Sequence, residues 1–359
     1  MKYSGIELIR HLSLAFGPSG YEDEVRDAII EQIEGECDGY CIDRVGNLVA
    51  KICGRGMDYR AHDPKRLMIC AHMDEVGFMV SHITDEGYLK FGMLGGMDPR
   101  VLCGKHVTVM HEGKRIPGLI ATKAIHLQTP EERKTITPVE KMYIDIGAKD
   151  AEDATTYASV GDYATFDSDL ECFGEDSAYV KGKALDDRVG CAAMIEIMRS
   201  LYHHPCDMPF DVYFAFTCCE EIGIAGAIVA ANTVRPDISL ILETTAVNDL
   251  PDTKGGARVA ELGDGGVITI ADNYTIYDAG LVRFALAAAE EKGIKCQIKQ
   301  YMSGGNDSRH VQQSTDGVRV MALSLPTRYI HSSANVGKYE DYESIRALIE
   351  TMLRDWRAN

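Results

Sequence analysis

The sequence is short of basic residues. It contains 37 Lys and Arg residues against 55 Asp and Glu residues, which gives a formal net charge of −18 at pH 7. Binding to a phosphate backbone requires a basic surface, so this composition argues against a nucleic-acid partner. An acidic surface instead favours solubility and attracts cationic ligands.

Long apolar runs and paired cysteine motifs are also missing. No stretch has the apolar length that a membrane-spanning helix needs, and charged residues interrupt the N-terminal segment, unlike a secretion signal. The 11 cysteines are scattered and never spaced as Cys-x-x-Cys, which argues against a zinc ribbon or a thioredoxin-like site. We therefore expect a cytoplasmic protein without a membrane partner, in which most cysteines are reduced.

The order of apolar segments predicts an α/β fold. Nearly continuous apolar segments are typical of strands that are covered on both faces, and they occur at 66–72, 210–217 and 238–242. Helical periodicity occurs at 189–201, 226–232, 281–292 and in a final helix whose apolar face extends to Trp356. This alternation predicts a three-layer α/β/α sandwich.

The stretch from residue 76 to residue 166 has a different pattern. The segments 106–110 and 115–120 alternate as hairpin strands do, on either side of His111-Glu112-Gly113-Lys114. Helical periodicity is weak throughout this stretch. We expect a small β-barrel-like domain at 76–166, inserted into an α/β domain that comprises residues 1–75 and 167–359.

Two short segments place histidine and aspartate at the ends of predicted elements. His72 ends a strand, and Asp74 points the same way, so its carboxylate can accept the free ring N–H of a metal-binding histidine. Asp186 stands before a predicted helix. It can cap that helix, or it can offer its two oxygens to two cations while Asp187 or Arg188 braces it.

Further carboxylate and imidazole groups follow other predicted strands. Glu220 and Glu221 come after the strand 210–217, where buried carboxylates are costly unless each has a partner. One of them can bind a metal ion while the other faces its water. Glu243 closes another apolar run, and His331 lies in Pro326-Thr327-Arg328-Tyr329-Ile330-His331-Ser332. Because α/β sheets bind ligands beyond the carboxyl ends of their strands, we expect these groups to converge.

Together these residues offer imidazoles and carboxylates to a metal. Such donors suit zinc, cobalt or manganese, and two ions that share one carboxylate form a hydrolytic centre. The spare glutamate of the pair can act as a general base. The residues therefore predict a hydrolase with two divalent metal ions per subunit.

Four ordered segments resemble the motifs of a known family, the tetrahedral or glutamyl-type aminopeptidases, also called the cellulase M or FrvX-like family. These segments are His72-Met73-Asp74-Glu75-Val76-Gly77, Lys183-Ala184-Leu185-Asp186-Asp187-Arg188, Glu220-Glu221-Ile222-Gly223 and Arg328-Tyr329-Ile330-His331-Ser332. The resemblance runs nearly end to end. It implies a cytosolic dinuclear metallopeptidase whose catalytic domain is interrupted by a β dimerisation domain, here residues 76–166.

The resemblance also implies a metal ligand set. Asp186 would bridge both ions, and His72 and Glu243 would complete the ligands of one ion. Glu221 and His331 would complete the ligands of the other. Glu243 stands where many members of the family have Asp, and its extra methylene is expected to shift the geometry or the metal preference.

Two catalytic roles follow from the same resemblance. Glu220 would be the general base, and Asp74 would orient His72. The segment Gly304-Gly305-Asn306-Asp307-Ser308 resembles a Gly-Gly-Thr-Asp loop of the family, with Asn306 in place of Thr. This departure concerns substrate contacts more than the metal ions.

The activity that the resemblance implies is the removal of N-terminal residues from short peptides. The active form would be a homodimer that often assembles into a twelve-subunit tetrahedral shell. Two alternatives stay open, a deacylase of related fold acting on N-acyl amino acids and an inactive assembly subunit. The complete ligand set argues against the second alternative. Acidic, basic and aliphatic N-terminal residues are all preferred by some member, so the preference of this chain is not determined.

Overall fold

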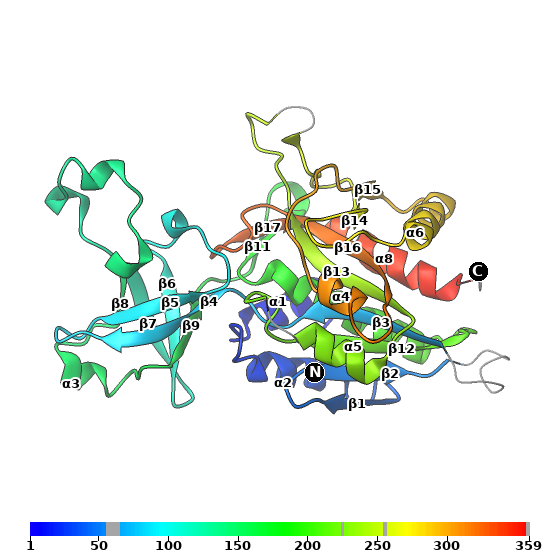
Figure 1. The fold of residues 1–359 in the computed structure, drawn as a ribbon, viewed down its shortest axis with the longest axis horizontal. Helices are drawn as coiled ribbons and strands as arrows, with labels where there is room; N and C mark the ends of the chain where they lie inside the picture. The colour runs from blue at the N-terminus through cyan, green and yellow to red at the C-terminus, as the bar shows by residue number, and fades with distance from the viewer. Residues whose placement is uncertain (55–64, 224–225, 254–256, 357–359) are drawn as a thin grey trace.

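The computed structural model describes residues 1–54, 65–223, 226–253 and 257–356. Its main feature is an eight-stranded sheet (Figure 1). In sheet order the strands are β1 (Gly39–Ile42), β2 (Leu48–Ile52), β12 (Phe210–Thr217), β3 (Lys65–His72), β13 (Ile238–Ala246), β16 (Arg319–Thr327), β14 (Gly266–Thr269) and β15 (Cys296–Ile298).

The four central strands β12, β3, β13 and β16 run parallel. Most of their residues are buried, as expected for strands that are covered on both faces. The register pairs Thr217 of β12 with His72 of β3, and Glu243 of β13 with Ser324 of β16. The carboxyl ends of these strands therefore meet at one edge of the sheet.

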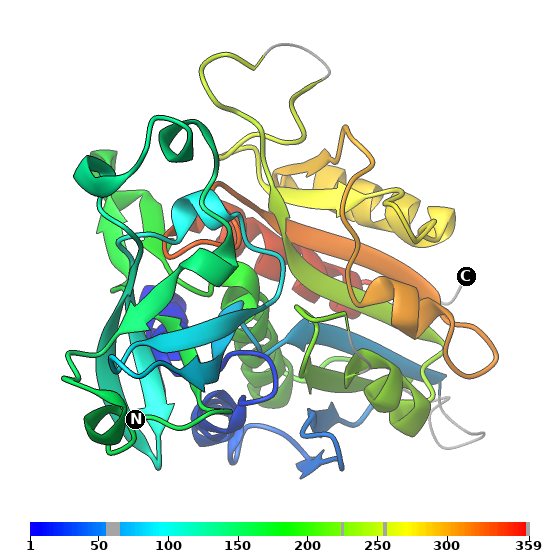
Figure 2. The same ribbon diagram turned by 60° about the vertical axis from the view of Figure 1, so that its left-hand side comes forward.

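Helices cover both faces of the sheet (Figure 2). On one face, α4 (Leu185–His203) packs on β3 and β13 and contacts α1 (Gly5–Leu14), α2 (Asp23–Ile33) and α8 (Tyr339–Arg354), and α8 contacts α6 (Ala279–Lys292). On the other face, α5 (Gly226–Val234) packs on β12 and α7 (Ser308–Gln312) packs on β16. The predicted three-layer sandwich is confirmed.

A closed barrel projects from one side of the sandwich (Figure 1). In barrel order its strands are β4 (Gly77–Ile83), β5 (Leu89–Leu94), β8 (Tyr143–Asp145), β7 (Lys114–Ala121), β6 (His106–His111) and β9 (Tyr163–Phe166). The barrel has its own hydrophobic core, which includes Phe78 and Phe91. Glu112 and Gly113, which join β6 to β7, both have positive φ, as two-residue hairpin turns require.

The remaining elements are short. They are the three-stranded sheet of β10 (Glu171–Phe173), β11 (Tyr179–Gly182) and β17 (Asn335–Lys338), the helix α3 (Ala151–Ala154), and the 3-10 helices η2 (Pro99–Val101), η3 (Ile125–Leu127), η4 (Glu132–Lys134), η5 (Val139–Lys141) and η6 (Glu175–Ser177). Within the described residues, no helix combines the length and the apolar character that crossing a membrane would require.

Two terminal elements differ from the sequence-based expectation. The final helix α8 ends at Arg354, so Trp356 does not lie on its apolar face. Trp356 packs edge to face against Phe210 of β12 and Phe284 of α6 instead. The helix α1 has no counterpart among the predicted elements. It buries Leu8, Ile9, Leu12 and Ser13.

Candidate metal centre

The polar residues at the strand ends meet at one edge of the sheet. Five residues come from separate elements: His72 ends β3, Glu243 lies in β13, Asp186 lies in the first turn of α4, and Glu221 and His331 follow β12 and β16. Parallel strands bring such groups together because their carboxyl ends lie side by side. The structure thus gathers all five side chains that the sequence analysis proposes as metal ligands.

Asp186 lies between two imidazoles. Its Oδ1 is 3.5 Å from Nε2 of His72, and its Oδ2 is 3.3 Å from Nε2 of His331. On the far sides, His72 Nε2 is 3.7 Å from Oε2 of Glu243, and His331 Nε2 is 3.3 Å from Oε2 of Glu221. Two adjacent donor groups therefore share one carboxylate.

The donor atoms are close enough to surround a cation. One ligand atom from each of His72, Asp186 and Glu221 lies within 4.8 Å of the others, and the same holds for His72, Asp187 and Glu243. Asp186 Oδ1 is buried and makes no hydrogen bond with the described residues. A buried carboxylate oxygen without a partner is costly unless a cation lies against it, so these residues fit divalent metal ions.

Hydrogen bonds at Nδ1 orient both imidazoles. His72 Nδ1 is 3.0 Å from the main-chain oxygen of Asp74 and 3.4 Å from its carboxylate, so the closer acceptor is the carbonyl. His331 Nδ1 is 2.7 Å from the main-chain oxygen of Gly96, which lies beyond β5 of the barrel. An N–H at Nδ1 leaves the Nε2 lone pair of each ring free to bind a metal ion.

The Asp74 carboxylate organises the loop after β12. It accepts hydrogen bonds from the main-chain N–H groups of Glu220 and Glu221, both at 3.0 Å, and from Ser19 Oγ at 2.6 Å. Burial alone would raise the pKa of Asp74, but the hydrogen bond and charge of His72 and the bond from Ser19 lower it overall. Asp74 is therefore an anion that fixes the backbone of the glutamate pair.

Most carboxyl groups of the cluster have a raised pKa. Burial raises the pKa of Glu220 and Glu243 well above the usual range and that of Glu221 to about 8, and neighbouring carboxylates add to each increase. Burial alone would lower the pKa of His331, but Asp186 and Glu221 raise it overall to about 10. Metal ions must therefore displace protons when they enter the cluster.

Asp187 is a further buried carboxylate of the cluster. Its Oδ1 accepts a hydrogen bond from the N–H of Gly190 at 3.0 Å, and its Oδ2 makes none with the described residues. A Cβ atom at Gly190 would collide with both carboxylate oxygens of Asp187. One of its carboxylate oxygens also lies within 4.8 Å of ligand atoms of His72 and Glu243. Asp187 is therefore a further potential donor, a role that its prediction as a brace for Asp186 does not include.

Asp307 lies behind the glutamate pair and is absent from the predicted site. It accepts a hydrogen bond from Thr217 Oγ1 at 2.8 Å, and burial raises its pKa to about 6. Its charge in turn helps to raise the pKa of Glu220. The sequence holds a weak signal for this residue, because Asp307 follows the Gly-Gly-Asn segment that resembles the family loop.

Arg188 forms hydrogen bonds to two main-chain segments next to the site. Its fully buried guanidinium donates to the main-chain oxygen of Met73 at 2.6 Å and to that of Gly17 at 3.1 Å. These bonds tie the segment before Ser19 to the end of β3, next to His72. Arg188 thus holds two loops together rather than bracing Asp186 directly.

The centre opens where the sandwich meets the barrel. The His331 side chain is 32% exposed, whereas those of Asp186 and Glu221 are 8% and 3% exposed. A small hollow reaches these three residues, and its lining includes Val76 and Phe166 at the base of the barrel. Access to the centre is therefore from the His331 side.

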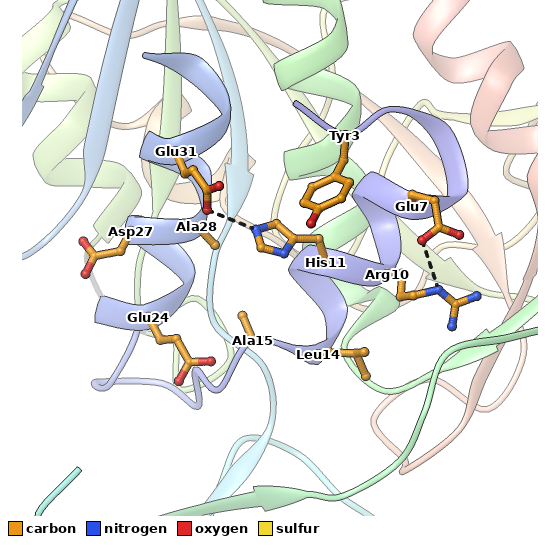
Figure 3. Close-up of a pocket in the computed structure, with 10 residues that line it drawn as sticks. All are labelled: Tyr3, Glu7, Arg10, His11, Leu14, Ala15, Glu24, Asp27, Ala28 and Glu31. Carbon is orange, nitrogen blue, oxygen red and sulfur yellow. Dashed lines mark ion pairs between the residues drawn. The ribbon is translucent and has the colours of Figure 1, made fainter. Parts of the chain in front are cut away.

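A larger hollow of about 560 Å³ lies elsewhere, between α1 and α2 (Figure 3). Two pairs of its polar side chains lie close to each other. Arg10 lies 3.5 Å from Glu7, and His11 Nε2 lies 3.9 Å from Glu31 (Figure 3). None of the candidate metal ligands lines this hollow, so it is separate from the centre at the strand ends.

A family profile and a curated relative both match this chain over most of its length. The profile of a family described as M42 glutamyl aminopeptidase matches residues 46–348. The chain is 32% identical to FrvX of Escherichia coli (strain K12), covering 97% of this chain and 94% of that protein.

Solved structures give the same result. The TET aminopeptidase from the marine sediment archaeon Thaumarchaeota archaeon SCGC AB-539-E09 is 33% identical, with a TM-score of 0.93 and coverage of 98% of this chain and 96% of the other. The TET1 peptidase of Pyrococcus horikoshii, which can assemble into a tetrahedron or a large octahedral shell, is 35% identical, with a TM-score of 0.85 and coverage of 98% and 99%.

Loading the chelator-treated protein with Zn²⁺ at pH 7 should release protons. Glu221, with a pKa of about 8, and His331, with a pKa of about 10, are protonated at pH 7 and must lose protons to bind a metal ion. Fewer protons should be released at pH 9, because Glu221 is then already ionised. Calorimetric titration in buffers of different ionisation enthalpy measures the number released.

The variant Glu221→Gln is the matched control for this measurement. It has nearly the same size but no proton to lose, so it should release about one proton fewer at pH 7. A wild-type proton count that is the same at pH 7 and pH 9 would contradict the role given to Glu221.

Proposed function

The chain belongs to the M42 glutamyl aminopeptidase family, and on that premise we propose that it is an aminopeptidase in which two divalent cations, zinc or cobalt, act together on the N-terminal peptide bond of short peptides. The observation that carries the proposal is the position of Asp186, with one carboxylate oxygen facing each of two imidazoles at 3.5 and 3.3 Å. A single cation would leave one of these donor pairs unused.

We assign the ligands by the same contacts. Asp186 would be shared by both cations, His72 and Glu243 would help to hold one of them, and Glu221 and His331 would help to hold the other. Manganese is an alternative metal, because carboxylate-rich sites accept several divalent ions.

Bound cations would supply Lewis acidity, which polarises the scissile carbonyl and lowers the pKa of a water towards neutrality. The residues of the chain do the rest. Glu220 takes a proton from the attacking water and returns it to the leaving amine. Asp74 holds the main-chain N–H of Glu220 at 3.0 Å, which keeps the base in place. The many carboxylates of the cluster favour a substrate with a cationic free α-amine.

A substrate panel tests the proposed activity. The purified protein, incubated with Zn²⁺, Co²⁺ or Mn²⁺, should cleave aminoacyl-anilides and short peptides that have a free N-terminus and should leave their N-acetylated counterparts intact. Cleavage of N-acyl amino acids instead would indicate a deacylase. The absence of cleavage with every metal would indicate an inactive assembly subunit, and either result would overturn the proposal.

Replacing the proposed base should separate chemistry from metal binding. Glu220→Gln should lower kcat by about 10²- to 10⁴-fold, because an amide cannot accept the proton, while the metal content measured by mass spectrometry stays near that of the wild type. The matched control is Glu31→Gln at the hollow between α1 and α2, which should keep full activity. Near-normal turnover of Glu220→Gln would show that another group is the base.

We also propose that the barrel forms the contact of a homodimer and that these dimers assemble into a dodecamer. A relative, the TET1 peptidase of P. horikoshii, can assemble into a tetrahedron, which supports this proposal. Ile125 and Leu127, in a loop between β7 and β8 of the barrel, are 60% and 71% exposed. Large exposed apolar side chains often mark a protein interface.

Light scattering should therefore give a mass of twelve 39.5 kDa chains. Leu127→Glu should reduce that mass, because it would place a charge in the contact, whereas Glu31→Gln should not. A wild-type protein that is monomeric at micromolar concentration would refute the assembly.

A further inference from the structure

A second group of potential metal ligands lies beside the glutamate pair. The sulfur atoms of Cys218 and Cys219 and a carboxylate oxygen of Glu22 lie within 4.8 Å of one another. All 11 cysteines of the chain are free thiols. The group shares no residue with the candidate metal centre, although Cys219 is next to Glu220 in the chain.

The geometry of this group is fixed by the surrounding structure. Cys219 has a φ of 58°, a left-handed conformation that few residues other than Gly, Asn and Asp adopt. Glu22 Oε1 accepts hydrogen bonds from the N–H of Cys219 at 3.0 Å and from that of Gly20 at 2.8 Å. The same oxygen lies 3.5 Å from Cys219 Sγ, so the carboxylate is held against the sulfur.

The other thiol, that of Cys218, can donate a hydrogen bond to either of two oxygen atoms. Cys218 Sγ lies 3.1 Å from the main-chain oxygen of Val45 and 3.2 Å from Oδ1 of Asn47. Cys218 and Glu22 are buried, and Cys219 is partly exposed, so one side of the group is open to solvent. The two sulfur atoms and one carboxylate oxygen thus lie close together beside the side that is open to solvent.

We propose that Cys218, Cys219 and Glu22 form a binding site for a thiophilic divalent cation, Zn²⁺ or Cd²⁺, that is separate from the two-cation centre. Thiolate donors select such ions over Mg²⁺ and Ca²⁺, which prefer oxygen ligands. Each thiol that binds releases its proton to the buffer. Two thiolates and one carboxylate then carry three negative charges, one more than the cation.

The position of this site couples it to the proposed base. Three consecutive main-chain N–H groups, those of Cys219, Glu220 and Glu221, are held by the carboxylates of Glu22 and Asp74. A cation that binds Glu22 competes for the oxygen that fixes Cys219, and Glu220 is the next residue. Occupancy therefore lowers turnover, a consequence that rests on the proposed function, whereas binding itself does not.

Cadmium is the probe that tests binding directly. Thiolate ligands give Cd²⁺ an ultraviolet charge-transfer band, and imidazole and carboxylate ligands do not, so the band is independent of the main centre and of any peptidase activity. Titration of the Zn²⁺-loaded protein with Cd²⁺ should give a band that saturates at one ion per chain. A wild-type protein without a saturable band would overturn the proposal.

Variants assign the band to these residues. Cys219→Asn keeps a side chain that tolerates the left-handed backbone, and Cys218→Ser changes one atom; both should lose the band while the thermal midpoint shows that they are folded. Glu22→Gln should weaken Cd²⁺ binding by at least about tenfold. The control is Cys103→Ser, which replaces an exposed cysteine outside the group and should leave the band unchanged. A band that survives in both cysteine variants would place the thiolates elsewhere and refute the site.

Discussion

Buried carboxylates that repel one another converge at one edge of the sheet, and the surrounding hydrogen bonds hold them there. Asp186, Glu221 and Glu243 converge with two imidazoles, and Asp187 and Glu220 lie beside them. In the absence of cations the cluster must retain protons, because burial raises the pKa of most of its carboxyl groups. Such a cluster lowers the stability of the fold unless its charges are compensated, and bound divalent cations would compensate them.

Hydrogen bonds from residues outside the cluster hold its side chains and loops in place. Asp74, itself held by Ser19, fixes the backbone of the glutamate pair, and Arg188 ties the loop before Ser19 to β3. The barrel contributes as well, because the carbonyl of Gly96 orients the imidazole of His331. The centre is thus shaped by segments that are distant in sequence, and the barrel takes part in its geometry.

Much of this organisation follows from local patterns. The apolar run 210–217 corresponds to β12 and the alternation around Glu112 to a hairpin, because burial on both faces and tight turns impose recognisable residue choices. The helix α1 was missed although its buried residues Leu8, Ile9 and Leu12 recur at helical spacing. The end of α8 has no such local signal, because Trp356 leaves the helical pattern to pack against Phe210 and Phe284. Asp307 has only a weak signal in the sequence, the Gly-Gly-Asn segment before it, and its contact with Thr217 in the structure connects it with the site.

Strand periodicity and polar residues at strand ends are local properties, so the fold class and the chemical types of the candidate ligands can be predicted from short stretches of sequence. Which atoms face one another depends instead on how distant segments pack, and this is visible in the folded chain. It aimed the two oxygens of Asp186 at different imidazoles, and it gave His72 the main-chain oxygen of Asp74 as its nearest partner. It also brought Glu22 to Cys219, across most of the chain. Such pairings depend on the parallel register and on helix packing, which no short stretch of sequence encodes.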